Sequence, residues 1–180
     1  MKIINTTLEG VYIIENFHAL DSRGEFVKTF NSKTFEENNL NTVWNESYFS
    51  ISKKDTIRGM HFQLPPHDHY KLVNVQAGSI LDVVVDLRKS SSTYGKYDFF
   101  ELNDRNKRSI YIPKGFAHGF LALEDNTIST YNVSTGYNPE SDCGIKYNSI
   151  GFEWNHIEDP IISDRDLNFV TLDMFKSPFK

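Results

Sequence analysis

The chain has 180 residues and carries 19 Lys and Arg against 24 Asp and Glu, which gives a formal net charge of −5 at pH 7. A domain of this size can bury a core without disulfides or metal, and its acidic balance excludes a protein held to nucleic acid by overall charge. The single cysteine, Cys143, excludes an internal disulfide and a cysteine-rich zinc site, while the lack of a long apolar run or an apolar leader predicts a cytoplasmic protein without a membrane span.

Short β-forming segments separated by turns follow one another along the chain. In chain order the expected strands are 11–14, 26–30, 43–51, 57–63, 71–76, 79–87, 97–102, 110–113, 119–123 and 127–133, with one helix over 32–39 that Ser32 could cap. Many short strands with turns between them are typical of a β-sandwich or barrel. No repeat, low-complexity tract or linker interrupts this pattern, so we predict a single domain over 1–180.

The segment 79–87 is the most informative strand. Its period of two places Asp82, Val84 and Asp86 on one face and only Leu and Val on the other. If both faces are covered, one is a dry core and the other a partly polar interior, which a ligand-holding barrel needs. An edge strand with one wet face would give the same pattern, so the alternation alone leaves both interpretations open.

Four of the six histidines fall in two clusters. The first cluster, within 58–71, holds His61, His67 and His69, and the second, within 112–120, holds His118. Three histidines, two basic residues and a glutamine within fourteen positions are too dense for a solvated loop alone. The clusters therefore predict a functional site.

One interpretation of these clusters is a metal site. His67, His69 and His118 resemble the two half-motifs of metal-dependent cupin barrels, in which a His-x-His pair and a third His from a neighbouring strand form a ligand set. The carboxylate expected shortly after the first pair is missing from 70–78, and the positive charge of Lys71 would oppose a cation.

A second interpretation comes from motifs spread over about 10–167. They are Asp21-x-Arg23-Gly24-x-Phe26, Arg58-Gly59-x-His61-x-Gln63, Lys71-Leu72-Val73, the run 82–88, Ser92-Thr93-Tyr94-Gly95, the run 112–120, Tyr131, Tyr137-x-Pro139 and Ile162-Ser163-x-x-Asp166. In this order they resemble the dTDP-4-dehydrorhamnose 3,5-epimerase family. The resemblance implies an all-β fold, a metal-free cupin jelly-roll β-barrel with a few short helices. It also implies a homodimer that acts on nucleotide-linked 4-keto sugars without a cofactor.

The chemistry of that reaction explains the catalytic residue types. A proton can be removed from the carbon beside a ketone near neutral pH only when a base lies at that carbon and the enolate oxygen is stabilised. His61 is the candidate base because imidazole titrates near neutral pH, and Asp166 would orient its ring. Lys71 would stabilise the oxyanion, and Tyr131 would return a proton from the opposite face, which inverts the configuration.

The remaining candidates would bind the substrate. Arg23 and Arg58 suit a diphosphate because a guanidinium presents a fork of donors to phosphate oxygens. His118 and Asp82 would line the cavity and hold the keto oxygen or a neighbouring hydroxyl. The resemblance and the histidine clusters add Phe26, Lys28, Glu46, Tyr48, Gln63, His67 and His69.

The chain departs from the family pattern at three places. The family usually has Gln where His69 stands, an acidic residue where Lys28 stands, and Gln-x-Asn where Glu46-Ser47-Tyr48 stands. An ionised Glu46 only accepts hydrogen bonds, so it suits a base edge rich in donors, such as guanine or cytosine. The sequence therefore predicts the reaction class and leaves the nucleotide open among dTDP, GDP and CDP.

We therefore predict an isomerase that inverts C3, C5 or both in a nucleoside-diphosphate 4-keto-6-deoxy sugar. It would serve deoxysugar biosynthesis for surface polysaccharide. Two alternatives stay open: a metal-dependent cupin that uses His67, His69 and His118, and a catalytically silent sugar-nucleotide-binding protein on the same scaffold. His18 and His156 match no motif and are expected at the surface.

Overall fold

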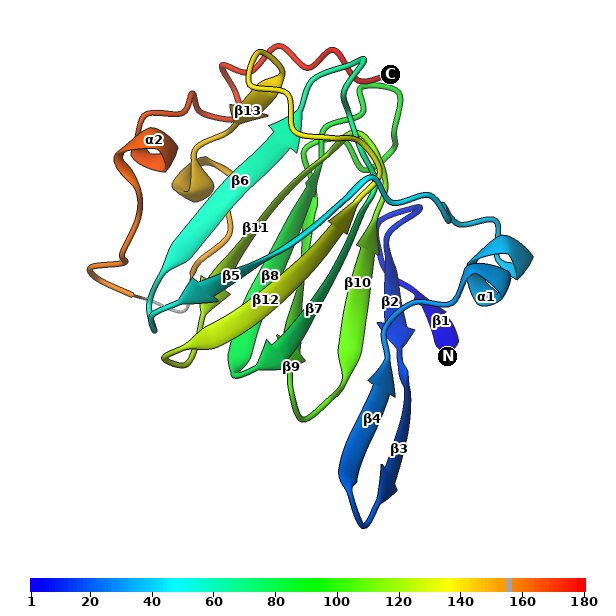
Figure 1. Cartoon of the computed structure of the whole chain (residues 1–180). Helices are drawn as coiled ribbons and strands as arrows, with labels where there is room; N and C mark the ends of the chain where they lie inside the picture. The colour runs from blue at the N-terminus through cyan, green and yellow to red at the C-terminus, as the bar shows by residue number, and fades with distance from the viewer. Residues whose placement is uncertain (155–156) are drawn as a thin grey trace.

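A computed structural model describes residues 1–154 and 157–180, so His156 lies outside the described part of the chain. Two antiparallel sheets lie face to face, and a two-stranded ribbon projects from them (Figure 1). The predicted all-β architecture with a few short helices is confirmed. Within the described residues no helix is long and apolar enough to cross a bilayer.

The strands divide among the three sheets as follows. The six-stranded sheet contains, in spatial order, β1 (Lys2–Asn5), β2 (Tyr12–Glu15), β10 (Arg108–Ile112), β7 (Lys71–Ala77), β12 (Thr127–Val133) and β5 (Glu46–Ser52). The five-stranded sheet contains β13 (Asp142–Gly144), β6 (Ile57–Gln63), β11 (Phe116–Ala122), β8 (Ser79–Asp86) and β9 (Tyr97–Asn103). The ribbon pairs β3 (Phe17–Asp21) with β4 (Gly24–Lys28), and the helical segments are α1 (Ser32–Glu37), a 3₁₀ turn (Tyr147–Ser149) and α2 (Asp164–Leu167).

The strand pairing is that of a jelly roll. The strands pair from the outside of the chain inward: β5 with β12, β6 with β11, β7 with β10 and β8 with β9. Each sheet runs from one edge strand to another in the described residues. The predicted jelly roll is therefore confirmed, and it is formed by two open sheets that face each other.

Strand β8 has both faces covered, as its alternation allowed. It lies between β11 and β9, and all eight of its residues are buried. Val84 packs in the core between the sheets, while Val83 and Val85 pack beneath the C-terminal segment with Trp154. The interpretation as an edge strand is wrong. Asp82, which alternation places on the same face as Val84, therefore lies between the sheets.

Several short elements escaped the sequence prediction. Strands β1, β3 and β13 and helix α2 were not expected; β1 and β13 have four and three residues and pair along an edge of their sheet. The expected helix forms, but Asn31 rather than Ser32 caps it, because the Asn31 side chain accepts the Thr34 N–H. The turn that joins β3 and β4 uses Gly24 at φ +116, a conformation that other residues rarely adopt.

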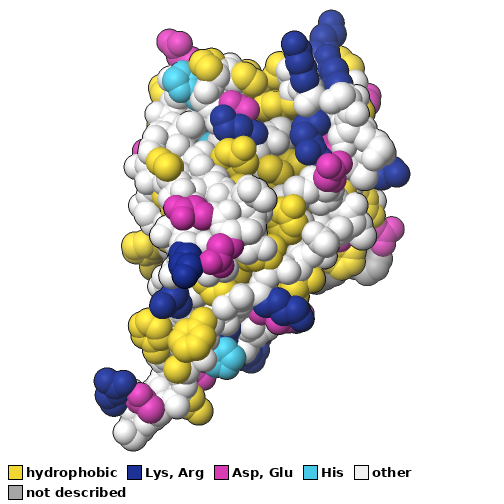
Figure 2. Space-filling view, turned by 90° about the vertical axis from the view of Figure 1, so that its right-hand side faces the viewer, with side chains coloured by type: hydrophobic (Ala, Val, Ile, Leu, Met, Phe, Trp, Pro, Cys, Tyr) yellow, Lys and Arg dark blue, Asp and Glu magenta, His cyan; other side chains and the backbone are white. Residues whose placement is uncertain are grey.

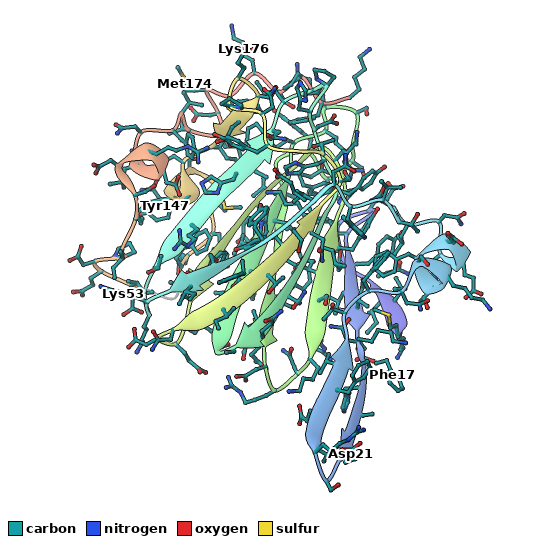
Figure 3. All side chains as sticks on the ribbon, viewed as in Figure 1. Phe17, Asp21, Lys53, Tyr147, Met174 and Lys176 are labelled. Atoms are coloured by element: carbon teal, nitrogen blue, oxygen red, sulfur yellow. The ribbon has the colours of Figure 1, made fainter. Side chains whose placement is uncertain are left out.

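The ribbon formed by β3 and β4 stands apart from the sheets. Phe17 and Asp21 mark it in Figure 3, away from the side chains that fill the space between the sheets. Figure 2 shows hydrophobic side chains gathered along this projection. Phe17, Leu20 and Phe26 are 50%, 74% and 58% exposed, an unusual amount of apolar surface for a short ribbon.

Candidate active site

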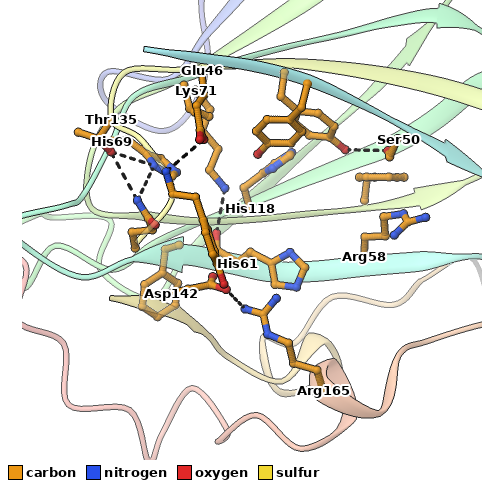
Figure 4. Close-up of a pocket in the computed structure, with 17 residues that line it drawn as sticks. Glu46, Ser50, Arg58, His61, His69, Lys71, His118, Thr135, Asp142 and Arg165 are labelled. Atoms are coloured by element: carbon orange, nitrogen blue, oxygen red, sulfur yellow. Dashed lines mark hydrogen bonds and ion pairs between the residues drawn. The ribbon is translucent and has the colours of Figure 1, made fainter. Parts of the chain in front are cut away.

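A pocket of about 410 Å³ opens between the two sheets, within the size range of small-molecule sites (Figure 4). It is lined by Glu46, Tyr48, Ser50, Arg58, His61, Phe62, Gln63, His69, Lys71, His118, Phe120, Tyr131, Val133, Thr135, Tyr137, Asp142 and Arg165. Both sheets contribute, since β6 and β11 belong to one and β5, β7 and β12 to the other. The jelly roll thus brings together the two histidine clusters, which lie far apart in the sequence.

Two glycines of the sequence motifs explain how His61 and His118 become neighbours. These histidines are paired in register across β6 and β11. A Cβ on Gly59 would lie only 2.5 Å from the Gly119 Cα, so the two strands could not approach as they do with larger residues. The motif glycines are therefore required by the close packing of the two strands that carry the histidines.

His61 and Asp166 form a hydrogen-bonded pair, with His61 Nε2 at 2.8 Å from Asp166 Oδ1. The Gly59 N–H donates to the other carboxylate oxygen at 3.1 Å. Burial raises the pKa of Asp166, but the hydrogen bonds from His61 and Gly59 and the charge of His61 outweigh it and hold the pKa below its usual value. An ionised carboxylate only accepts, so Nε2 carries the proton and Nδ1 keeps a lone pair.

Lys71 is a buried cation beside this pair. Its Nζ donates to the His61 carbonyl oxygen at 3.2 Å, and its side chain lines the pocket. Burial lowers the pKa of Lys71 to about 8, against the opposing attraction of Asp82 and Asp142. At neutral pH the ammonium is therefore mostly charged, in a place where little water weakens its field.

His118 and Asp82 form a second pair, deeper in the fold. His118 Nε2 lies 2.8 Å from Asp82 Oδ2, and both residues are buried. Burial lowers the pKa of His118 despite the nearby carboxylate, so this imidazole is neutral at neutral pH. The two histidines therefore differ: His61 lies 30% exposed at the pocket, whereas the His118 side chain is 4% exposed.

Tyr131 faces the pocket from the other sheet. Its ring stacks on Tyr48 with centroids 4.8 Å apart, and its hydroxyl lies 3.4 Å from Ser50 Oγ. Burial raises the pKa of Tyr131, so the phenol keeps its proton at neutral pH. His61 on β6 and Tyr131 on β12 thus line the pocket from opposite sheets. An imidazole and a phenol therefore lie on two sides of one pocket.

Most of the candidate residues meet at this pocket. Those that line it are His61, Lys71, Tyr131, Glu46, Tyr48, Arg58, Gln63, His69 and His118, with Asp82 and Asp166 bonded behind the histidines. The sequence reasoning missed five lining residues with polar side chains: Ser50, Thr135, Tyr137, Asp142 and Arg165. Ser50 could have been found, because it shares a strand face with Tyr48 at a spacing of two.

Four candidates are not brought to this pocket. Arg23, Phe26 and Lys28 lie on the projecting ribbon, where Arg23 is paired with Asp21 of its own turn. They are absent from the pocket lining because the ribbon extends away from the sheets. His67 contributes its carbonyl oxygen, which accepts from Gln63 and Thr135, and its side chain does not line the pocket.

The residues named for a metal site do not assemble into one. Among residues 1–154 and 157–180, no three His, Cys, Asp or Glu side chains are grouped so that they could hold a metal ion. His118 is bonded to Asp82, and the Nδ1 atom of His69 faces the amide of Gln63. The ligand set of His67, His69 and His118 is therefore not formed.

Comparisons with known proteins agree with the geometry. The family model described as dTDP-4-dehydrorhamnose 3,5-epimerase matches residues 5–174. The dTDP-4-dehydrorhamnose 3,5-epimerase of Methanothermobacter thermautotrophicus is 43% identical over 175 residues, which cover 95% of this chain and 94% of that protein. That of Escherichia coli K12 is 39% identical over 96% of this chain and 95% of its own length. The crystal structure of dTDP-6-deoxy-D-glucose-3,5-epimerase from Legionella pneumophila, in complex with dTDP-4-keto-L-rhamnose, matches with a TM-score of 0.92 at 35% identity, covering 97% of this chain and 94% of that one.

Proposed function

The chain belongs to the dTDP-4-dehydrorhamnose 3,5-epimerase family of sugar-nucleotide isomerases, and we propose that it inverts C3, C5 or both in a dTDP-linked 4-keto-6-deoxy sugar. The observation that carries the proposal is that His61, paired with Asp166, and Tyr131 lie on opposite sheets, with Lys71 beside His61. We assign the reaction to deoxysugar biosynthesis for surface polysaccharide, in the cytoplasm.

The first half of the reaction removes a proton. His61 Nδ1 takes the proton from the carbon beside the ketone, and the electrons of the C–H bond move to the C4 oxygen. The positive charge of Lys71 stabilises the enolate oxygen that forms. Asp166 keeps its charge and stabilises the imidazolium through the bond to Nε2, as carboxylates do in other His–Asp pairs.

The second half returns a proton to the other face. The enolate carbon takes the proton of the Tyr131 hydroxyl, and the ketone re-forms as the electrons return from the oxygen. Because Tyr131 belongs to the sheet opposite His61, the new C–H bond lies on the opposite side and the configuration is inverted. Tyr131 then recovers a proton and His61 loses one, so the protein is unchanged over a cycle.

Arg58 and Glu46 are the residues that bear on the nucleotide end of the substrate. Arg58 lies at the pocket, and within the described residues it donates only to Ser52 and the Ile51 carbonyl, so its guanidinium remains available for a diphosphate. One oxygen of Glu46 accepts the Tyr137 N–H at 3.1 Å. Because that bond already occupies an oxygen of Glu46, the carboxylate is less available to a donor-rich base. The family relationship favours dTDP.

The proposed function is tested by isotope exchange. The purified protein is incubated in D₂O with dTDP-4-keto-6-deoxyglucose, and in parallel with a GDP-linked 4-keto-6-deoxy sugar. We expect deuterium at C3, C5 or both of the dTDP sugar, because each proton removed by His61 is replaced from solvent. Nuclear magnetic resonance measures this incorporation. Binding of the sugar nucleotide without any exchange would identify the silent binding protein instead. Faster exchange with the GDP sugar would contradict the nucleotide assignment.

We further propose a homodimer in which the ribbon of β3 and β4 lies against a second copy of the chain. The support is the exposed apolar surface of Phe17, Leu20 and Phe26. In addition, Arg23 does not line the pocket of its own chain, although its motif resembles that of a substrate-binding turn. In a dimer the ribbon would bury that surface and could carry Arg23 to the partner's pocket.

The dimer is tested by light scattering after size-exclusion chromatography. We expect a mass near twice 20.8 kDa. The double variant Leu20→Asp/Phe26→Asp should shift the protein toward the monomer, because two carboxylates would have to be desolvated in the interface. A wild type that stays at the monomer mass over the micromolar range would refute the proposal.

A further inference from the structure

Tyr131 gives up its proton in the proposed reaction, so its oxygen has to be reprotonated before the next cycle. The Tyr131 side chain is only 6% exposed. Within the described part of the chain, Ser50 is the one hydrogen-bond partner of its hydroxyl, with Oγ at 3.4 Å (Figure 4). Ser50 is therefore the protein group placed to act on this oxygen.

The pairing of β5 with β12 brings the two hydroxyls together. Tyr131 lies opposite Tyr48, and Ser129 lies opposite Ser50. Ser50 is thus the diagonal neighbour of Tyr131, which a long side chain can reach. Because Tyr48 and Ser50 lie two residues apart on one face of β5, the ring stacked on Tyr48 extends alongside Ser50.

The Ser50 hydroxyl is free to donate and is closer to water than the phenol. It has no hydrogen-bond partner other than Tyr131 among residues 1–154 and 157–180. Ser50 lines the pocket, is partly exposed and lies on the edge strand of its sheet. A hydroxyl both donates and accepts, and its hydrogen rotates to suit its partners. Ser50 can therefore donate to Tyr131 while it accepts from a water molecule in the pocket.

We propose that Ser50 is a positioning residue for Tyr131: its hydroxyl donates to the phenol oxygen and then passes on the proton that restores the phenol. The inference rests on the proposed function, because it needs a Tyr131 that protonates the sugar carbon. With Ser50 as the donor, the Tyr131 hydrogen is left to point at the substrate. As that hydrogen leaves, the oxygen gains negative charge and can only accept, so the hydrogen bond from Ser50 strengthens.

The proton balance closes with one water molecule. The phenolate oxygen takes the Ser50 hydroxyl hydrogen, and Ser50 Oγ takes a hydrogen from water. The hydroxide that remains is neutralised by the proton that His61 releases. The hydrogen bond from Ser50 also opposes burial, which raises the pKa of Tyr131, and so keeps the phenol a better acid than burial alone would leave it.

The test uses the two fates of the enolate in D₂O with the dTDP-linked keto sugar. Protonation from the His61 side restores the starting configuration and protonation by Tyr131 inverts it, and nuclear magnetic resonance measures deuterium in each sugar. Ser50→Ala should lower the rate of inversion about tenfold, the effect of losing one hydrogen bond to a charged oxygen. Deuterium in the uninverted sugar should not fall, because the His61 side of the pocket is unchanged.

Two further variants separate the hydroxyl from the size of the side chain. Thr and Val are both β-branched and differ in the hydroxyl. Ser50→Thr should therefore keep inversion within about threefold of the wild type, while Ser50→Val should lose about tenfold. Ser47→Ala is the matched control, because Ser47 lies on the same strand but does not line the pocket, and it should behave as the wild type. Thermal melting establishes that each variant is folded.

Each outcome decides the matter. Inversion by Ser50→Ala within about threefold of the wild type overturns the inference and leaves the proposed function intact. An equal loss of inversion and of deuterium in the uninverted sugar also overturns it, because Ser50 would then support substrate binding or proton removal instead of Tyr131. Equal rates in Ser50→Thr and Ser50→Val overturn it as well. A wild type that catalyses no exchange overturns the proposed function, and the inference with it.

Discussion

His61→Asn is expected to lower kcat by about a thousandfold and to abolish deuterium incorporation at the same time. The substitution keeps a polar side chain in the pocket but removes the Nδ1 lone pair that takes the proton. Affinity for the sugar nucleotide should change little, because the diphosphate and base are held by other residues. Single-turnover exchange in D₂O and isothermal titration with the dTDP sugar measure the two effects separately.

Asp166→Asn is the companion variant, and it tests the orientation of the His61 ring. An amide in place of the carboxylate can turn its N–H toward His61 Nε2, which stabilises the tautomer with its proton on Nδ1. That tautomer cannot act as the base, so activity should fall even though the geometry is preserved. Wild-type exchange rates in His61→Asn would place the base elsewhere in the pocket. An active Asp166→Asn would show that the carboxylate does not select the tautomer.

Several of the strands that the sequence predicted, such as β7, β8 and β11, are buried on both faces. Strand β8 is the clearest case, since its alternation separated Asp82 and Asp86 from the valines on its other face, and the structure covers both faces. Strands β1 and β13 were missed because they are short and are defined by their pairing at a sheet edge. Pairing is a tertiary property that local composition does not record.

The site was predictable in residue type and not in arrangement. The family resemblance and the chemistry that it implies selected His61, Lys71, Tyr131 and Asp166, and all four lie at or directly behind one pocket. The tautomer of each histidine depends on partners distant in the sequence, such as Asp166 for His61, so spacing carries no information about it.

The ribbon of β3 and β4 shows that a motif does not predict the position of its residues. Its motif indicated a substrate contact for Arg23, but a motif does not specify where a projecting ribbon ends in space. Arg23 lies on the turn of that ribbon and pairs with Asp21 instead of reaching its own pocket. A motif therefore predicts residue types, whereas the fold decides where their side chains lie.

Lys71→Met is expected to lower kcat about 100-fold to 1,000-fold, because it removes the charge nearest the developing oxyanion while keeping a side chain of similar length. The pKa of about 8 adds a second expectation for the wild type. The active form is the ammonium, which loses its proton as the pH rises through the pKa. The wild-type kcat/KM should therefore be lost above a pH near 8, and this alkaline limb reports Lys71 in the free enzyme.

The pH profile separates an electrostatic role of Lys71 from a merely structural one. In Lys71→Met the residual activity should show no alkaline limb near pH 8, since the titrating group is gone. In Lys71→Arg the charge persists at all accessible pH values, so whatever activity remains should also lack that limb. A limb that stays near pH 8 in both variants would assign it to another group and contradict the role of Lys71. The burial that lowers the Lys71 pKa also strengthens the electric field of the ammonium at the substrate oxygen. Burial thus destabilises the free ammonium and strengthens its interaction with the enolate.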